Sequence, residues 1–439
     1  IISLPMNASA RCRPIITRSL CLLLAMKQVH SSLQLLRSVG STSSMKMSST
    51  SNNRQGRIWI HRPFEVTPSS TATKTNPSIS CCPLPTKTLK PPLENRIHSL
   101  YQSGGSEALW QWCQSKQEFY NSQFSSRVAT DDSDRIQKRK LPSSSSFSRE
   151  VDVTIYLPKS KPDYTKLHHG ICLHVHGGGW IFGDSQNQVA HRCLEMTEIM
   201  NVAVVSVEYS LVSTFSDNGQ IFDPVNEVGT AIDWIENNGA DELNTKPVYV
   251  ASGESSGAHL LLLAMLQRRD QFDTDRRPLT STWKCLNLVY GFYDLSGSPS
   301  VRSDGNDSSP LCGNELLCMA DLYYEKILQE GNQDDQFREK IIDRDRQHPS
   351  VSPMYANLSN LPPALISVGT ADPLIDDSLF LASRYSLCGN DVETVLYEGG
   401  EHGIGHFGLQ ENDEMGRRAR EYTLQFMKRY FEECGLTDG

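Results

Sequence analysis

The first 64 residues of the chain contain neither aspartate nor glutamate. Nine lysines and arginines and many serines precede the first acidic residue, Glu65. A basic, serine-rich segment without acids is typical of an organelle transit peptide, so we expect a plastid or mitochondrial location. The apolar run at 20–26 follows three arginines and would also fit a secretory signal, which leaves secretory and cytoplasmic locations as alternatives. A segment without any targeting function is the remaining interpretation.

Other signatures are missing along the whole chain. No apolar run reaches the roughly 18 residues that a membrane helix needs, so we expect no stable membrane insertion. The 12 cysteines include no C-x-x-C pair, which favours free thiols over a zinc or thioredoxin-like site. The net charge of −9 argues against a nucleic-acid-binding protein.

The composition changes along the chain. Residues 1–91 are rich in Ser, Thr, Pro and Asn without periodicity, and we expect a disordered leader and linker there. Residues 93–127 have apolar positions at helical spacing and predict one or two amphipathic helices. Residues 129–148 are polar again, and the serines at 143–146 predict a loop.

From Glu150 onward, predicted strands and helices alternate. The strands are predicted at 151–155, 170–175, 202–207, 247–251, 286–290, 364–368 and 393–397, and the helices at 225–237, 258–268, 376–388 and 413–433. Continuous apolar strands between helices predict an α/β fold with a mostly parallel sheet covered on both faces. The charged segment 315–347 interrupts this alternation. We expect it to form a helical cap together with 93–127, within one domain that spans 92–436.

The segment Gly253–Gly257 fits the pattern G-x-S-x-G between a predicted strand and a predicted helix. Two glycines allow a sharp turn that presents the serine hydroxyl at its tip, and the following helix N-terminus favours developing negative charge. This context predicts Ser255 as the nucleophile of a serine hydrolase. If the segment were only a glycine-rich turn, Ser256 would serve equally well.

A rarer motif, His176-Gly177-Gly178-Gly179, ends the predicted strand at 170–175. Successive glycines let backbone N–H groups face a tetrahedral oxyanion. We therefore predict an oxyanion hole formed by Gly177, Gly178 and Gly179 together with the N–H of Ser256. A phosphate-binding glycine turn is the alternative, but the G-x-G-x-x-G and P-loop lysine patterns are missing.

A serine nucleophile needs a base, and the base needs an orienting partner. Asp372 and His402 each follow a predicted strand, and the chain order Ser255, Asp372, His402 is that of α/β-hydrolases. We predict His402 as the general base and Asp372 as its partner. Weaker candidates are His406 near the same loop, Asp376 and Asp377 in the next helix, and the structural histidines His174 and His259.

Together these motifs resemble the hormone-sensitive-lipase-like branch of the α/β-hydrolases, which includes plant-type carboxylesterases. The resemblance covers roughly residues 150–430 and rests on 176–179, 253–257, 291–296, 352–353, 361–377, 397–399 and His402. It implies an eight-stranded sheet, a helical cap partly from the N-terminal segment, and hydrolysis of short or medium acyl esters.

The chain departs from the family pattern at three places. Glu254 stands where the family usually has Asp, and Ser256 where it usually has Ala. The family segment Tyr-Arg-Leu-Ala-Pro-Glu is replaced at 209–214 by Tyr-Ser-Leu-Val-Ser-Thr. We expect the first two changes to tune the site, whereas the third leaves the form of the cap-side pocket wall open.

The predicted function is hydrolysis of a small-molecule carboxylic ester through an acyl-enzyme. No cofactor is expected, because a nucleophile, a base and fixed dipoles suffice for this chemistry. Trp180 and Phe182 are candidates for the substrate pocket and equally for the core. An aryl-formamidase or prenylcysteine methylesterase is the alternative enzyme. A non-catalytic receptor of the same fold, as the gibberellin receptors are, is less favoured because those receptors have lost the triad histidine that is present here as His402.

Overall fold

The computed structural model describes ten stretches of the chain and five helical positions between 111 and 118. The stretches are 58–61, 134–143, 150–159, 167–186, 188–213, 222–272, 279–303, 312–330, 346–403 and 414–435. The leader prediction for 1–91 falls outside this part of the chain except at 58–61, and the cap prediction for 93–127 lies largely outside it as well. Trp112, one of the five helical positions, is partly buried against the core.

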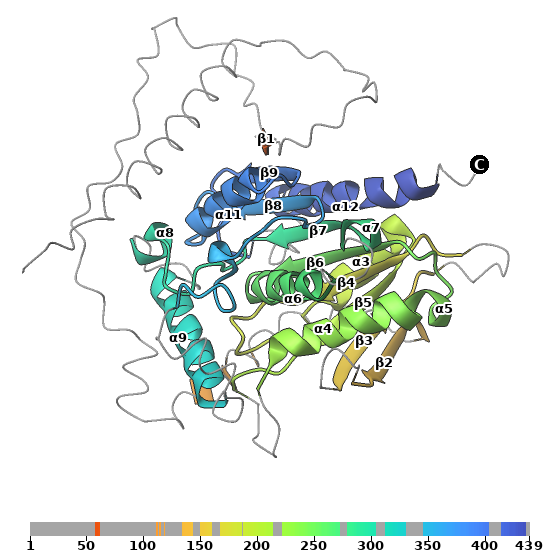
Figure 1. Ribbon diagram of the computed structural model, residues 1–439, viewed down its shortest axis with the longest axis horizontal. Helices are drawn as coiled ribbons and strands as arrows, with labels where there is room; N and C mark the ends of the chain where they lie inside the picture. Colours follow the sequence, from red (N-terminus) through yellow and green to blue (C-terminus); the bar gives the residue numbers. More distant parts are fainter. Residues whose placement is uncertain are drawn as a thin grey trace, which may run out of the picture. The chain divides into compact units, whose positions relative to one another are not determined.

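The described strands form one sheet in the order β1-β9-β8-β7-β6-β4-β5-β3-β2 (Figure 1). Its nine strands are β1 (Ile58–His61), β2 (Ile136–Leu141), β3 (Val151–Tyr156), β4 (Ile171–Val175), β5 (Ala203–Glu208), β6 (Tyr249–Glu254), β7 (Trp283–Val289), β8 (Ala364–Gly369) and β9 (Val392–Tyr397). Only the pairs β2–β3 and β3–β5 are antiparallel. The predicted α/β fold with a mostly parallel sheet is confirmed.

Helices cover both faces of this sheet (Figure 1). The longer described helices are α3 (Ala190–Met200), α4 (Pro224–Trp234), α6 (Ser256–Phe272), α9 (Gly313–Glu330), α11 (Ile375–Leu387) and α12 (Glu414–Gly435); the short ones are α5 (Ala240–Glu242), α7 (Leu279–Thr282) and α8 (Pro299–Arg302). A π-helical turn, Ile235–Gly239, joins α4 to α5. No described helix is long and apolar enough to cross a membrane.

Two layers of the core lie on opposite faces of the sheet because side chains alternate along each strand. In β4, Leu173 and Val175 belong to the larger apolar cluster, which includes residues of α4, α6 and α11. Cys172 belongs to a second cluster, which includes residues of α3 and α12. Strands that are buried on both faces read as continuous apolar runs, and this is why central strands such as β4 and β5 could be predicted.

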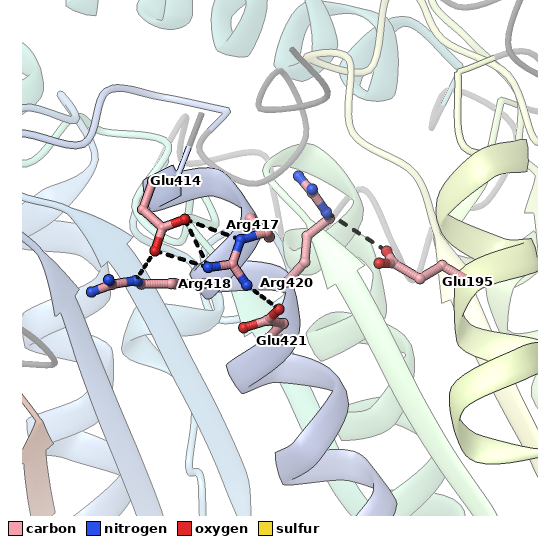
Figure 2. Close-up of polar contacts among 6 residues, drawn as sticks. All are labelled: Glu195, Glu414, Arg417, Arg418, Arg420 and Glu421. Atoms are coloured by element: carbon pink, nitrogen blue, oxygen red, sulfur yellow. Dashed lines mark hydrogen bonds and ion pairs between the residues drawn. The ribbon is translucent and has the colours of Figure 1, made fainter. Parts of the chain in front are cut away.

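Helix α12 is amphipathic, and ion pairs link its turns on the solvent side. Glu414 pairs with Arg417 and Arg418, and Arg417 also pairs with Glu421 (Figure 2). Arg420 reaches instead to Glu195 of α3, at 3.7 Å. Solvent screens exposed pairs of this kind, so they add little to stability and burial of the apolar face dominates the docking of α12.

The structure differs from the sequence-based expectations at the margins of the sheet. The polar segment 129–148, in which we predicted a loop only at 143–146, contains the edge strand β2 at 136–141. Exposed charges such as Lys138 and Lys140 are typical of an edge strand. Because of them, β2 lacks the clear alternation of apolar and polar residues by which a strand is predicted. At the other edge, β1 comes from the segment that we expected to be a disordered leader, and it pairs in parallel with β9. Helix α9 lies in the predicted cap segment 315–347 but begins at Gly313.

Candidate active site

The turn between β6 and α6 presents Ser255. This residue has a left-handed backbone with a φ of 51°, and its N–H donates to the carbonyl of Val289 at 2.9 Å. A Cβ added at Gly257 would lie 2.2 Å from the carbonyl oxygen of Val175, and one at Gly253 would lie 2.7 Å from that of Gly257. Both motif glycines are therefore required by close backbone approach. The strained conformation of Ser255 costs about 1–2 kcal/mol and places its side chain at the tip of the turn.

The structure brings Ser255, His402 and Asp372 together in one hydrogen-bonded chain. Ser255 Oγ lies 3.0 Å from His402 Nε2, and His402 Nδ1 lies 3.0 and 2.9 Å from the two carboxylate oxygens of Asp372. All three residues are buried. The juxtaposition follows from topology, because the carboxyl ends of the parallel strands β6, β8 and β9 lie at the same edge of the sheet.

The hydrogen bonds also define the proton positions on His402. A carboxylate only accepts, so Nδ1 carries the proton and Nε2 is left to accept one from Ser255. Asp372 Oδ1 accepts a second hydrogen bond from the N–H of Leu374 at 2.8 Å. The loops that carry Asp372 and His402 are bonded to each other, since the Ala371 N–H donates to the Gly400 carbonyl at 2.9 Å. The imidazole is thus held in the tautomer that a general base needs.

The weaker acidic candidates have other partners. Asp376 accepts the N–H of Ser300 at 2.8 Å. Asp377 accepts the N–H groups of Tyr293 and Asp294 at 2.7 and 2.9 Å and so anchors the segment that follows β7. The basic alternative His406 lies outside the described residues. Among the described residues, no group of three or more His, Cys, Asp and Glu could hold a metal ion.

The first of the three glycines after β4 lies beside the nucleophile. A Cβ added at Gly177 would lie 3.0 Å from the Glu254 carbonyl oxygen and 3.3 Å from Ser255 Cβ. Gly178 and Gly179 have φ values of +125° and +61°, which favour glycine. The Gly178 carbonyl accepts two N–H groups, both at 3.1 Å, from the turn that follows. Gly177 therefore lets the loop pass close to Ser255, where a side chain would be tight, and Gly178 and Gly179 supply the left-handed turn that follows.

The two pocket candidates are almost wholly buried. Trp180 is 1% exposed and Phe182 is 2% exposed, and both belong to the larger core cluster. The Trp180 ring stacks on Tyr323 of α9 with centroids 4.7 Å apart. Their core role is visible in the structure, and a contact with substrate stays a prediction.

A polar cluster behind the nucleophile was missed by the sequence reasoning. The Glu254 carboxylate lies 2.8 Å from Arg192 Nη1 of α3 and 3.6 Å from His174 Nε2, and it accepts the Tyr290 hydroxyl at 3.4 Å. The Tyr290 ring contacts the His402 ring edge to face at 4.9 Å. Glu254 stood inside the recognised motif, but its partner Arg192 lies in a helix that the sequence reasoning did not predict.

Comparison with known proteins places the chain in a family. A family model described as "alpha/beta hydrolase fold" matches residues 172–406, which include Ser255, Asp372 and His402. The chain therefore belongs to the α/β-hydrolases, and the resemblance to their carboxylesterase branch is confirmed.

Individual relatives are similar at a lower level. An acetyl esterase of Salmonella schwarzengrund is 28% identical over 270 residues, which are 58% of this chain and 70% of the relative. An arylesterase of Saccharolobus solfataricus is 25% identical over 252 residues, which are 56% of this chain and 70% of the relative.

Solved structures support the fold. A hyperthermophilic esterase from Pyrobaculum calidifontis superposes with a TM-score of 0.58 at 21% identity and covers 76% of this chain and 97% of its own. A thermostable carboxylesterase from a metagenomic library superposes with a TM-score of 0.57 at 21% identity. The superposition covers 75% of this chain and 99% of the carboxylesterase.

Proposed function

We propose that this protein is a serine esterase that hydrolyses small-molecule carboxylic esters through an acyl-enzyme. The observation that carries the proposal is the hydrogen-bonded chain Ser255–His402–Asp372, formed at a strand-to-helix turn beside a triple-glycine loop. The esterase names of the Salmonella and Saccharolobus relatives point to the same chemistry.

In the first half-reaction, His402 Nε2 takes the proton of Ser255 Oγ while Oγ attacks the ester carbonyl carbon. The C=O bond becomes a single bond, and its oxygen carries the negative charge. Asp372 stabilises the imidazolium that forms. Collapse of the tetrahedral intermediate breaks the bond to the alkoxy oxygen, which leaves with the proton from His402 and produces an acyl-serine.

In the second half-reaction, water replaces the serine hydroxyl as the nucleophile. His402 takes a proton from the water, the oxygen attacks the acyl-serine, and the proton then returns to Ser255 as the acid leaves. We assign stabilisation of both oxyanions to N–H groups of Gly177, Gly178 and Gly179 together with the N–H of Ser256. The Ser256 N–H lies at the first residue of α6, where the helix dipole also favours negative charge.

Replacement of Ser255 tests the proposal directly. Ser255→Ala is expected to lower kcat for p-nitrophenyl acetate or butyrate by at least about 10⁴-fold, because attack and acyl transfer both need the hydroxyl. Ser256→Ala is the matched control, since it keeps the backbone N–H and introduces the residue usual in the family. Full activity of Ser255→Ala would contradict the proposal. Phosphonate labelling with peptide mapping then identifies which serine reacts.

A panel of substrates separates the alternatives. We expect hydrolysis of esters with short or medium acyl groups, since the named relatives include an acetyl esterase. Preferential cleavage of formylkynurenine would favour the aryl-formamidase alternative, and preference for a prenylcysteine methyl ester would favour the methylesterase. Tight binding of a small molecule without turnover would favour the receptor.

A further inference from the structure

His259 and Trp180 are joined in the core next to the proposed oxyanion hole. Trp180 follows the three glycines and has a left-handed backbone with a φ of 61°. A bulky residue in this conformation is strained by about 1–2 kcal/mol, so its surroundings must hold it. Its indole Nε1 lies 3.3 Å from Nδ1 of His259, which is itself fully buried.

The partners of His259 determine its tautomer. Nε2 lies 2.7 Å from the carbonyl oxygen of Val351, which can only accept, so Nε2 carries the proton. Nδ1 then has a lone pair for the indole N–H of Trp180, which can only donate. Burial lowers the pKa of His259 to about 4, against the opposing effect of the Val351 carbonyl. At neutral pH the imidazole is therefore neutral and able to accept this hydrogen bond.

This hydrogen bond connects the two parts of the chain that supply the proposed oxyanion donors. His259 lies one turn into α6, where its N–H donates to the Ser255 carbonyl at 3.3 Å. The same helix begins with Ser256, whose N–H is one proposed donor. Trp180 directly follows the glycines that supply the other donors. The Trp180–His259 bond therefore bridges the glycine loop and the nucleophile helix.

Helix α9 packs against the same junction. Tyr323 stacks on Trp180 at 4.7 Å with a 17° interplanar angle, and it meets His259 edge to face at 5.6 Å. A Cβ added at Gly179 would lie only 2.2 Å from Met319 Sδ, so α9 also lies directly over the glycine loop. Dispersion contacts with α9 hold the glycine loop against α6, but they allow Trp180 to slide along the face of the Tyr323 ring. The directional hydrogen bond from Trp180 to His259 fixes this position.

We propose that His259 is a positioning residue: as a neutral acceptor for the Trp180 indole, it fixes the distance between the glycine-loop donors and the Ser256 donor and so preorganises the oxyanion hole. This inference rests on the proposed esterase function. The bond touches no reacting atom, and its effect is specific to states in which the carbonyl oxygen carries negative charge. Misplacement of such donors by about 1 Å can cost on the order of 100-fold in rate.

The test compares an inhibitor that forms an oxyanion with one that does not. An aryl trifluoromethyl ketone is attacked by Ser255 Oγ at its carbonyl carbon, its oxygen becomes the anion, and the serine proton passes to His402. The corresponding trifluoromethyl carbinol has a similar shape but no carbonyl group. Trp180→Phe keeps the ring face toward Tyr323 and removes the N–H.

For Trp180→Phe we expect kcat to fall about 10- to 100-fold with KM within about twofold, ketone affinity to fall by a similar factor, and carbinol affinity to stay unchanged. His259→Phe should behave alike, and the double variant should be no worse than the poorer single one, because both remove one bond. His259→Gln, which can still accept from Trp180 and donate to Val351, should retain most of the activity.

Trp283→Phe is the matched control. Trp283 is also a buried tryptophan with a bonded indole, 2.6 Å from Glu236, but it lies at the start of β7, away from the site. It should keep the wild-type kcat and ketone affinity. Wild-type values in Trp180→Phe and His259→Phe, or equal loss of ketone and carbinol binding in Trp180→Phe, would overturn the inference. Failure of the wild-type protein to hydrolyse esters or bind the ketone would instead overturn the proposed function.

Discussion

Asp377 gives the most direct link between one buried group and the stability of the fold. It lies in the first turn of α11, is fully buried, and accepts the N–H groups of Tyr293 and Asp294. Burial raises the pKa of Asp377 from its ordinary value of 3.8 to about 7, against the lowering effects of Ser298 and of the two N–H groups. The folded protein therefore binds this proton more tightly than the unfolded chain does.

The sign of the pH effect follows from this difference. Below about pH 4 the carboxyl is protonated in both states. Between about pH 4 and 7 the unfolded chain releases the proton while the folded protein keeps it, so the free energy of unfolding falls as the pH rises. Above pH 7 both states are ionised and the loss is complete. The difference between a pKa of 3.8 in the unfolded chain and about 7 in the folded protein corresponds to a loss of about 4 kcal/mol in the free energy of unfolding.

Asp377→Asn removes the titration and keeps an oxygen that can accept both N–H groups. Urea unfolding of the wild-type and variant proteins from pH 4.5 to 8 measures the difference between their free energies of unfolding. As the pH rises, we expect the free energy of unfolding of the variant to increase relative to that of the wild type. This difference should become constant above pH 7. Ser378→Ala, a substitution of the buried and non-titrating neighbour, is the control and should follow the wild-type pH dependence. Parallel curves for the wild type and Asp377→Asn would refute the reasoning.

Two further predictions concern the groups around Ser255. Asp372→Asn should lower kcat about 10⁴-fold with little change in KM, because the amide favours the wrong tautomer of His402; steady-state kinetics check this, and a loss below about tenfold would contradict the role of Asp372. Glu254→Gln should destabilise the protein by about 3–5 kcal/mol in urea unfolding, because it leaves the buried Arg192 guanidinium without its carboxylate, and Arg192→Met added to it should restore most of this loss. Equal stability of Glu254→Gln and the wild type would show that the pair is not coupled.

The central strands and the main site residues could be predicted because local patterns encode them. Strands such as 171–175 are apolar on both faces, and Asp372 and His402 follow two of them directly. In a parallel sheet, carboxyl ends of neighbouring strands meet, so chain order and strand ends were enough to bring Ser255, Asp372 and His402 together. The edge strand β2 has no such pattern, because its outward residues are charged and one strand neighbour alone determines its pairing.

Side-chain direction and partnership could not be predicted, because they depend on distant elements. The sequence offered Trp180 as pocket wall or core, and the deciding partners, His259 and Tyr323, are 79 residues or more away along the chain. His259 alone gave no indication of its tautomer, which is determined by the Val351 carbonyl. Such choices require the three-dimensional positions of groups that have no periodic relation in sequence.

Glu254 shows how one change within a motif requires others elsewhere. A carboxylate buried beneath the nucleophile turn is strongly destabilising without a counter-charge. Arg192 supplies that charge from α3, on the sheet face opposite to α6, and His174 and Tyr290 approach the same carboxylate. Because Tyr290 also contacts His402, the residue next to the nucleophile is connected through one aromatic ring to the proposed general base. The Glu254 side chain therefore connects the nucleophile turn to a buried polar cluster, in which Arg192 of α3 supplies the counter-charge.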